Sequence, residues 1–258
     1  MAPAELKREK NVFYRELGRQ KIQEMPENGQ ARFELGLVEL EHFHNNEEAA
    51  RLFAKACELS KTLAVAWFFH GVALCRLQRD ADALECFASA RRLGTNTTAL
   101  AEAEGDAFYN CKQFAEARKA YRRALQLQDS TDVLSKLGSA EVRMNQIGPG
   151  LKKLTLAIAK SAATPELHDR LVSAQLSLGH ISEAAQAAED KLRAAKPTES
   201  AYLRAAVLCM HAKQVDRALK IVGQGAREFP GSAELKQAAA QLGSQAREES
   251  HAANVAAC

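Results

Sequence analysis

Small and large residues recur along this sequence about every 34 residues, and this spacing constrains the fold more than any other feature. One small position recurs in steps of 34, 34, 33, 34 and 34 residues, at Ala49, Ala83, Ala117, Gly150, Ala184 and Ala218. A bulkier position keeps the same steps, at Phe53, Phe87, Tyr121, Leu154, Ala188 and Val222. A third position does so too, at Ala56, Ala90, Ala124, Ala157, Lys191 and Gly225. Because these positions lie three or four residues apart, they share one face of a helix. The chain is therefore built from repeated units.

The columns above belong to the second helix of each unit, and another helix, the first of the unit, precedes it along the chain. Residues 66–90 read as two amphipathic helices joined by a polar turn, with Trp67, Gly71 and Leu74 on one face of the earlier helix. The large position of the earlier helices recurs at Phe33, Trp67, Ala101, Leu134, His168 and Tyr202. Its small companion recurs at Leu37, Gly71, Gly105, Gly138, Val172 and Ala206, with Gly36 as an alternative in the first unit. A ring beside small residues lets two helices approach closely, so we expect Trp67 to be buried.

A helix–turn–helix unit of about 34 residues that carries Trp, Gly, Ala, an aromatic residue and Ala resembles the tetratricopeptide repeat. The second and third units match best, as Trp67/Gly71/Ala83/Phe87/Ala90 and Gly105/Phe108/Ala117/Tyr121/Ala124. The resemblance covers residues 27–230. It implies an all-α, right-handed superhelical solenoid of about six tetratricopeptide repeats, with the first helices lining a concave groove that binds partners. Later repeats depart from the pattern, as where Lys191 replaces an Ala.

Two helices are predicted to flank the repeats. Residues 1–26 read as an N-terminal helix that has the place of half a repeat, and residues 231–246 as a C-terminal capping helix, followed by a flexible tail over 247–258. The N-terminal helix carries two apolar stripes, one with Leu6, Phe13 and Leu17 and one with Tyr14, Ile22 and Met25. One stripe can pack on the first repeat. For the other we keep three possibilities open, which are a second copy in a homodimer, another domain, or the stems of basic side chains.

Composition narrows the class of protein. The 258 residues are 47% hydrophobic and carry a formal net charge of +3, which does not indicate bulk attraction to nucleic acid or membranes. No stretch resembles a signal peptide or a membrane span. The six cysteines show no paired spacing, so the sequence predicts a reducing, cytoplasmic location.

Neither catalysis nor metal binding is indicated. The sequence contains no phosphate-binding loop and no nucleophile elbow, so we expect a protein that is not an enzyme and needs no cofactor. Glu41, His42, His44, Glu47 and Glu48 cluster at the first turn, but polar residues are common in such turns and no further ligand is implied. Basic pairs such as Arg91-Arg92 fall in the second helices, where charges are usually only solvated, and they do not outweigh the balanced total charge.

The predicted function is therefore a protein–protein interaction scaffold that binds a peptide or protein segment in the concave groove. The stripe rotated one residue from Trp67 should face this groove. Its candidate contacts are Phe68, Val72 and Cys75 in the second repeat, Glu102, Asp106 and Tyr109 in the third, and Ser139 in the fourth. The same stripe contains Asp169, Ser173, Leu176, Leu203, Val207 and Met210 in the last two repeats. A flanking basic ridge contains Lys136, Arg143, Arg170 and Arg204. We expect Phe68, Val72 and Tyr109 to anchor the partner and the charged residues to select oppositely charged ones.

A weaker resemblance suggests an alternative function. The run of residues 7–36 is similar to the junction that leads from the catalytic domain into tetratricopeptide repeats in some bacterial family-2-type glycosyltransferases. This resemblance implies an accessory module that recognises substrate protein or assists assembly. The catalytic domain itself is not in these 258 residues.

Overall fold

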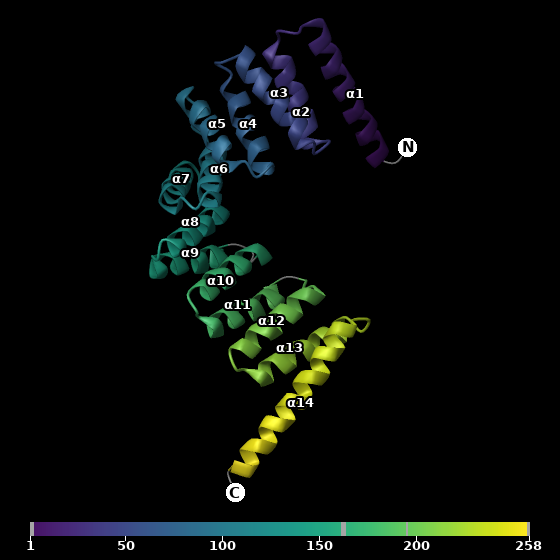
Figure 1. The fold of residues 1–258 in the computed structure, drawn as a ribbon, viewed down its shortest axis with the longest axis vertical. Helices are drawn as coiled ribbons and strands as arrows, with labels where there is room; N and C mark the ends of the chain where they lie inside the picture. The colour runs from purple at the N-terminus through teal and green to yellow at the C-terminus, as the bar shows by residue number, and fades with distance from the viewer. Residues whose placement is uncertain (1–2, 161–163, 195, 257–258) are drawn as a thin grey trace. The chain divides into compact units, whose positions relative to one another are not determined.

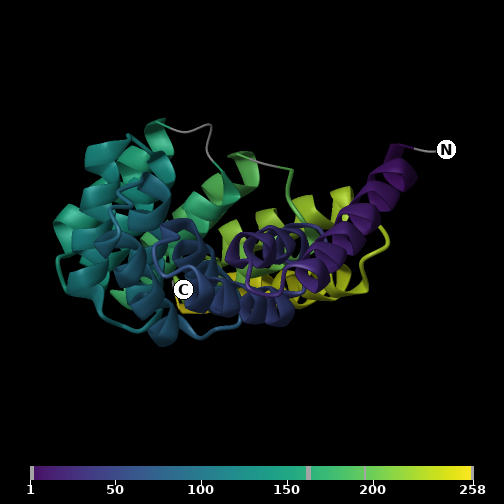
Figure 2. The ribbon, with the colours of Figure 1, turned by 90° about the horizontal axis from the view of Figure 1, so that it is seen from above.

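The structure, a computed structural model, describes residues 3–160, 164–194 and 196–256, and every regular element in these ranges is a helix (Figures 1 and 2). The helices are α1 (Pro3–Glu24), α2 (Gly29–Glu41), α3 (Asn46–Leu59), α4 (Ala64–Arg76), α5 (Asp80–Arg92), α6 (Thr98–Asn110), α7 (Phe114–Leu127), α8 (Thr131–Arg143), α9 (Ile147–Lys160), α10 (Pro165–Ser177), α11 (Ile181–Ala194), α12 (Glu199–His211), α13 (Val215–Glu228) and α14 (Ala233–Ala256). The all-α helical repeat solenoid predicted from the sequence is confirmed.

The chain forms two compact units that divide between Val133 and Leu134. In the first unit each helix from α1 to α7 packs on the next along the chain, and α4 also contacts α2 and α6. In the second unit the same sequential packing runs from α9 to α14. Contacts between neighbours along the chain are what a repeat protein requires, because no single core spans the array. No helix in the part of the chain described here is long and apolar enough to cross a membrane.

The turn within each helix pair places one residue in the left-handed region of backbone space. These residues are His44, Gln78, Lys112, Asn145, Gly179 and Lys213, with φ between 52° and 74°. Their steps of 34, 34, 33, 34 and 34 residues repeat those of the sequence pattern. In the second to sixth pairs the amide after this residue bonds to the carbonyl five residues earlier, as in Arg79 N to Leu74 O at 2.9 Å. This is the Schellman ending of a helix, so the first helices of these five pairs stop in the same way.

The first pair contains one extra residue at the end of α2. There the equivalent bond, from Asn45 N to Glu39 O at 2.9 Å, spans six residues instead of five. The small residue that faces the second helix is consequently Gly36, whose position matches Gly71 35 residues later, and not Leu37. For the same reason Phe33 corresponds to Phe68. The sequence columns place Phe33 with Trp67, and this assignment is wrong.

Glycines of the first helices lie directly against rings of the second helices. A Cβ placed on Gly36 would come within 2.6 Å of the Phe53 ring, and one on Gly71 within 2.4 Å of Phe87. Gly105 lies in the same way against Tyr121, at 2.4 Å. The rings are almost completely buried. This close contact of backbone and ring is the repeated core of the first unit.

Trp67 differs from this expectation, because it is half-buried rather than enclosed between the helices. Its indole Nε1 donates a hydrogen bond to the carbonyl oxygen of Lys61 at 3.2 Å, in the turn that precedes α4. The ring lines a surface hollow instead. The core position opposite Phe87 is filled by Gly71 and Phe68, which leaves Trp67 at the edge of the pair.

Helix α1 packs on α2 through polar contacts and one glycine, not through an apolar stripe. Arg15 forms a two-pronged ion pair with the buried Glu39, at 2.6 and 2.8 Å, and Gly18 lies against Leu35. Val12, Phe13, Tyr14, Leu17 and Met25 are exposed, with Phe13 at 62%, and Leu6 is outside the residues whose side chains are described. Figure 2 shows the N-terminal part of α1 extending away from α2 and α3. The homodimer through this helix stays a prediction.

At the other end of the chain, α14 covers the last repeat and continues further than expected. Leu235 is fully buried in the cluster formed by α12 and α13, and Leu242 packs at its edge. The helix was predicted to end at residue 246 and to be followed by a flexible tail, but it runs without interruption to Ala256 (Figure 1). Residues 247–256 lack an apolar period, yet they are rich in Ala and Glu, which favour helix by themselves.

Candidate functional site

Three predicted contact residues of the first unit lie on α4 and are half-buried. Phe68 packs edge-on against Phe69, with ring centroids 5.1 Å apart, and lies 6.1 Å from Phe87. Val72 and Cys75 pack on the edge of the same cluster. Burial, assisted by the nearby Asp80, raises the pKa of Cys75 to about 12, so its thiol is neutral. These side chains contribute to the core and offer only part of their surface to a partner.

The predicted residues on α6 are also partly occupied within the repeat. Asp106 accepts a hydrogen bond from the hydroxyl of Tyr121 at 2.8 Å, which fastens α6 to α7. The ring of Tyr109 packs edge-on against Phe114 at 5.2 Å. Glu102 is half-buried on the same helix. The structure thus places the ring of Tyr109 and the carboxylates of Glu102 and Asp106 on one helix, α6.

The predicted basic ridge of the second unit is divided among different contacts. Arg170 donates to the hydroxyl of the buried Ser135 on α8, and Ser139 donates to the Ser135 carbonyl oxygen at 3.0 Å. Lys136 is half-buried and Arg143 is exposed. Arg204 on α12 is exposed as well, and it lines a groove.

This groove lies between α10 and α12, with α11 behind it, and has a volume of about 670 Å³. The predicted stripe contributes to it from both helices, through Asp169, Ser173, Leu176, Leu203 and Val207. The sequence did not predict the participation of Val172, Ala188, Lys191, Ala201, Ala205 and Leu208. Leu176 and Val207 are 43% and 54% exposed, and together with Leu203 and Leu208 they give the groove an apolar lining.

Lys191 lines the groove from α11. It stands at the position where earlier repeats carry Ala56, Ala90, Ala124 and Ala157, all fully buried. A long side chain at this position takes space that a methyl group would leave to the neighbouring helix. The Lys191 ammonium pairs with both oxygens of Asp169, each at 2.6 Å. The groove thus has an apolar interior and a neutralised ion pair in its wall.

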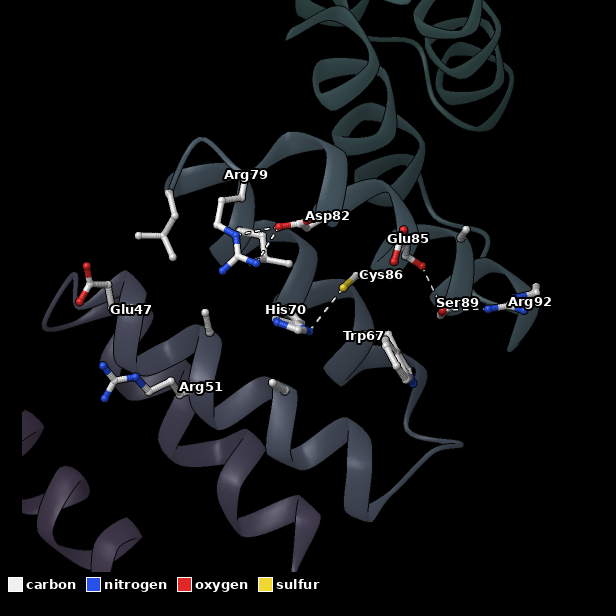
Figure 3. Close-up of a pocket in the computed structure, with 15 residues that line it drawn as sticks. Glu47, Arg51, Trp67, His70, Arg79, Asp82, Glu85, Cys86, Ser89 and Arg92 are labelled. Atoms are coloured by element: carbon white, nitrogen blue, oxygen red, sulfur yellow. Dashed lines mark hydrogen bonds and ion pairs between the residues drawn. The ribbon is translucent and has the colours of Figure 1, made fainter. Parts of the chain in front are cut away.

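A second and larger hollow, of about 1250 Å³, lies between α3 and α5 in the first unit (Figure 3). Trp67 and His70 of α4 line it, together with charged residues of the two flanking helices. The sequence reasoning missed it because it treated the second helices as a solvated outer face. The sequence feature that could have indicated this hollow was Trp67, a large ring for which the helix pair α4–α5 has no core position.

The cysteine and histidine of this hollow, Cys86 and His70, are both neutral. Cys86 Sγ lies 3.4 Å from His70 Nδ1. Burial raises the pKa of Cys86 to about 11 and lowers the pKa of His70, so the pair consists of a thiol and a neutral imidazole at physiological pH. A nucleophilic cysteine requires a thiolate, which this environment disfavours. Among the described side chains, no three His, Cys, Asp or Glu residues gather as metal ligands would.

Comparison with known proteins agrees with this architecture. No protein-family model matches the sequence, and no curated protein matches it. A tetratricopeptide repeat protein from Parabacteroides merdae ATCC 43184 has a TM-score of 0.69 at 12% identity, over 92% of this chain and 94% of that chain. YrrB, described as a TPR protein with an unusual peptide-binding site, has a TM-score of 0.60 at 17% identity, over 76% of this chain and 97% of its own.

A third structure is the APC/C hetero-tetramer Cut9–Hcn1, with a TM-score of 0.61 and 15% identity over 91% of this chain. Here the match spans 46% of the other chain, so this protein corresponds to less than half of it. Together these structures show that the chain has the tetratricopeptide-repeat fold.

Proposed function

We propose that this protein is an interaction scaffold that holds a segment of a partner protein in the groove between α10 and α12. The observation that carries the proposal is the exposure of Leu176 and Val207 in the lining of one groove of about 670 Å³. An apolar hollow of this kind on a repeat protein is best explained by a partner that covers it. The tetratricopeptide-repeat fold supports the proposal, because its first helices offer a continuous surface to a bound segment.

The charges around the groove specify the chemistry of the segment. Lys191 is already neutralised by Asp169, whereas Arg204 is exposed and forms no ion pair with any described residue. The groove therefore suits a segment with aliphatic side chains and a neighbouring carboxylate that pairs with Arg204. In the first unit, the exposed parts of Phe68, Val72 and Tyr109 would be apolar anchors for a partner. Glu102 and Asp106 would select its basic residues. The basic residues Lys136 and Arg170 would favour acidic ones.

Affinity capture with a double variant tests the groove. Leu176→Ser/Val207→Ser removes the apolar contact without changing charge, and we expect it to lose at least one partner that the wild-type protein captures. The matched control is Leu127→Ser/Leu156→Ser, which alters two leucines of similar exposure, 43% and 44%, on α7 and α9 outside the groove. Mass spectrometry compares the captured proteins. Identical partners for both double variants would exclude this groove as the binding site.

A charge variant tests the second feature of the proposed segment. Arg204→Glu should weaken capture of the same partner, and the loss should be larger at low ionic strength, where the pair is least screened. If the partner is a substrate of a glycosyltransferase, that enzyme should be recovered with it, which would favour the accessory role over a general scaffold.

A further inference from the structure

We propose that the hollow between α3 and α5 is a second binding surface, which takes one amphipathic helix of a partner, aligned antiparallel to α3 and α5. The partner helix carries acidic residues in its N-terminal turns and basic residues in its C-terminal turns. This surface belongs to the first unit, and the proposal does not depend on the groove between α10 and α12.

The connectivity of the chain gives the hollow its shape. Helices α3, α4 and α5 follow one another through the short turns 60–63 and 77–79, so α4 runs antiparallel to both neighbours and α3 and α5 run in the same direction. Helix α4 forms the floor, and small residues, Ala50 and Ala54 on α3 and Ala88 on α5, line the walls. Small residues in the walls allow another helix to approach closely, and a trough between two parallel helices has the shape that a single helix fills.

The walls carry a gradient of charge from one end of the hollow to the other. Glu47 lies in the first turn of α3, Asp82 and Glu85 lie in the first half of α5, and Arg92 is the last residue of α5. Figure 3 shows Glu47 at one end of the hollow and Arg92 at the other. Two basic residues also lie toward the acidic end, and both are paired: Arg79 with Asp82 at 2.6 Å, and Arg51 with Glu48 at 3.5 Å.

The charges that a partner can use are those without an ion pair. Among the described residues Glu47 and Glu85 form none, and Arg92 donates only to the hydroxyl of Ser89, at 3.0 Å. An acidic group is therefore free at the start of α3 and another in the middle of α5, and a basic group is free at the end of α5. A partner helix that runs antiparallel brings its own basic C-terminal turns to the acidic end. It also places its helix dipole against those of α3 and α5.

Trp67 provides the apolar anchor and a direct measurement. It lines the end of the hollow near Arg92, and a partly exposed indole beside an arginine is typical of the residues that dominate binding energy at interfaces. It is also the single tryptophan of the protein. Its fluorescence emission therefore reports occupancy of this hollow alone.

Two synthetic helical peptides without tryptophan test the proposal. Both have one leucine stripe and the same composition, but the first carries glutamates in its N-terminal turns and lysines in its C-terminal turns, and the second has these charges exchanged. We expect the first peptide to shift Trp67 emission to shorter wavelength in a saturable way, with affinity at least tenfold higher than that of the second. The variant Glu47→Lys/Glu85→Lys/Arg92→Glu should reverse this preference. Lys119→Glu, on α7 outside the hollow, should leave it unchanged.

Three outcomes would overturn the proposal. The first is equal affinity for the two peptides, and the second is no response of Trp67 to either peptide at millimolar concentration. The third is a Trp67 emission shift that depends on protein concentration without any peptide, which would show that a second copy of the chain occupies the hollow. Circular dichroism of each variant confirms that the helices are retained, so a lost preference is a loss of binding.

Discussion

In the first three pairs, a single glycine in the first helix sets how closely the ring of the second helix can approach. Gly71 shows this most clearly, because a methyl group at its Cα would lie 2.4 Å from the Phe87 ring, well inside van der Waals contact. The ring is fully buried and cannot move aside without displacing its neighbours. The sequence column of small residues is therefore a column of steric contacts, and glycine is required there for space, not for backbone freedom.

Gly71→Ala should accordingly destabilise the protein by about 1–3 kcal/mol through overpacking. Gly223 provides the matched control, because it is also inside a helix but has no atom within 4 Å of its added Cβ. Gly223→Ala should stabilise the protein by about 0.5–1 kcal/mol, since alanine loses less backbone entropy in a helix. Urea unfolding of both variants measures the two effects. Destabilisation of equal size in both would mean that the contact with Phe87 is unimportant.

Buried carboxylates connect successive helices, and Glu104 is the clearest example. It lies on α6 with 2% exposure and accepts ion pairs from Arg91 of α5, at 3.2 Å, and from Arg123 of α7. Burial raises the pKa of Glu104 above its usual 4.5, while the two arginines oppose the shift. The folded protein thus binds a proton that the unfolded chain has released. The contribution of Glu104 to stability is therefore greatest at acid pH and is lost as the pH rises through its folded pKa.

Removing one of the two arginines that pair with Glu104 should make this loss of stability at higher pH larger. Arg123→Met should lower the free energy of unfolding by roughly 1–3 kcal/mol at pH 7, less than for a fully broken buried pair because Arg91 remains. The difference from wild type should shrink as the pH falls through the raised pKa of Glu104, because the protonated carboxyl needs no basic partner. Lys119→Met is the control, since its pair with Glu116 at 2.9 Å is exposed and should contribute less than about 1 kcal/mol. A pH-independent difference for Arg123→Met would show that Arg123 acts only through packing.

The elements that the sequence predicted well are those whose pattern is repeated. Five columns of small and large residues determine where each helix pair lies, and the left-handed turn residues follow the same steps. Buried glutamates such as Glu39, Glu104 and Glu141 were not predicted, because a carboxylate in a polar sequence is read as exposed unless its basic partner on another helix is known. The extra residue in α2 was missed for a related reason, since only the hydrogen bond from Asn45 to Glu39 distinguishes Gly36 from Leu37.

At the scale of the whole molecule, the sequence predicted which side chains share a face better than it predicted where that face is open. The stripe that includes Leu203 and Val207 does line a groove, because helical periodicity fixes which side chains share a face. The same stripe on α4 is largely packed, because Phe68 fills core space beside Gly71. Where the surface is hollowed depends on the volume of side chains on neighbouring helices, such as Lys191. The periodic pattern of a single helix does not contain that information.

Each repeat is stabilised by contacts with the adjacent repeats, so a substitution in the core should have a local effect. Leu235 of α14 is fully buried against α12 and α13, and its amide is capped by the Ser232 hydroxyl at 3.1 Å. Leu235→Ala should destabilise the second unit by about 2–4 kcal/mol. Hydrogen exchange should show faster exchange in α12 and α13 but unchanged protection in α2 to α5, because repeats transmit stability only through adjacent interfaces. Leu156→Ala, at an exposed leucine of the same unit, should leave both regions unchanged. An equal loss of protection in α2 to α5 would show that the two units unfold as one cooperative body.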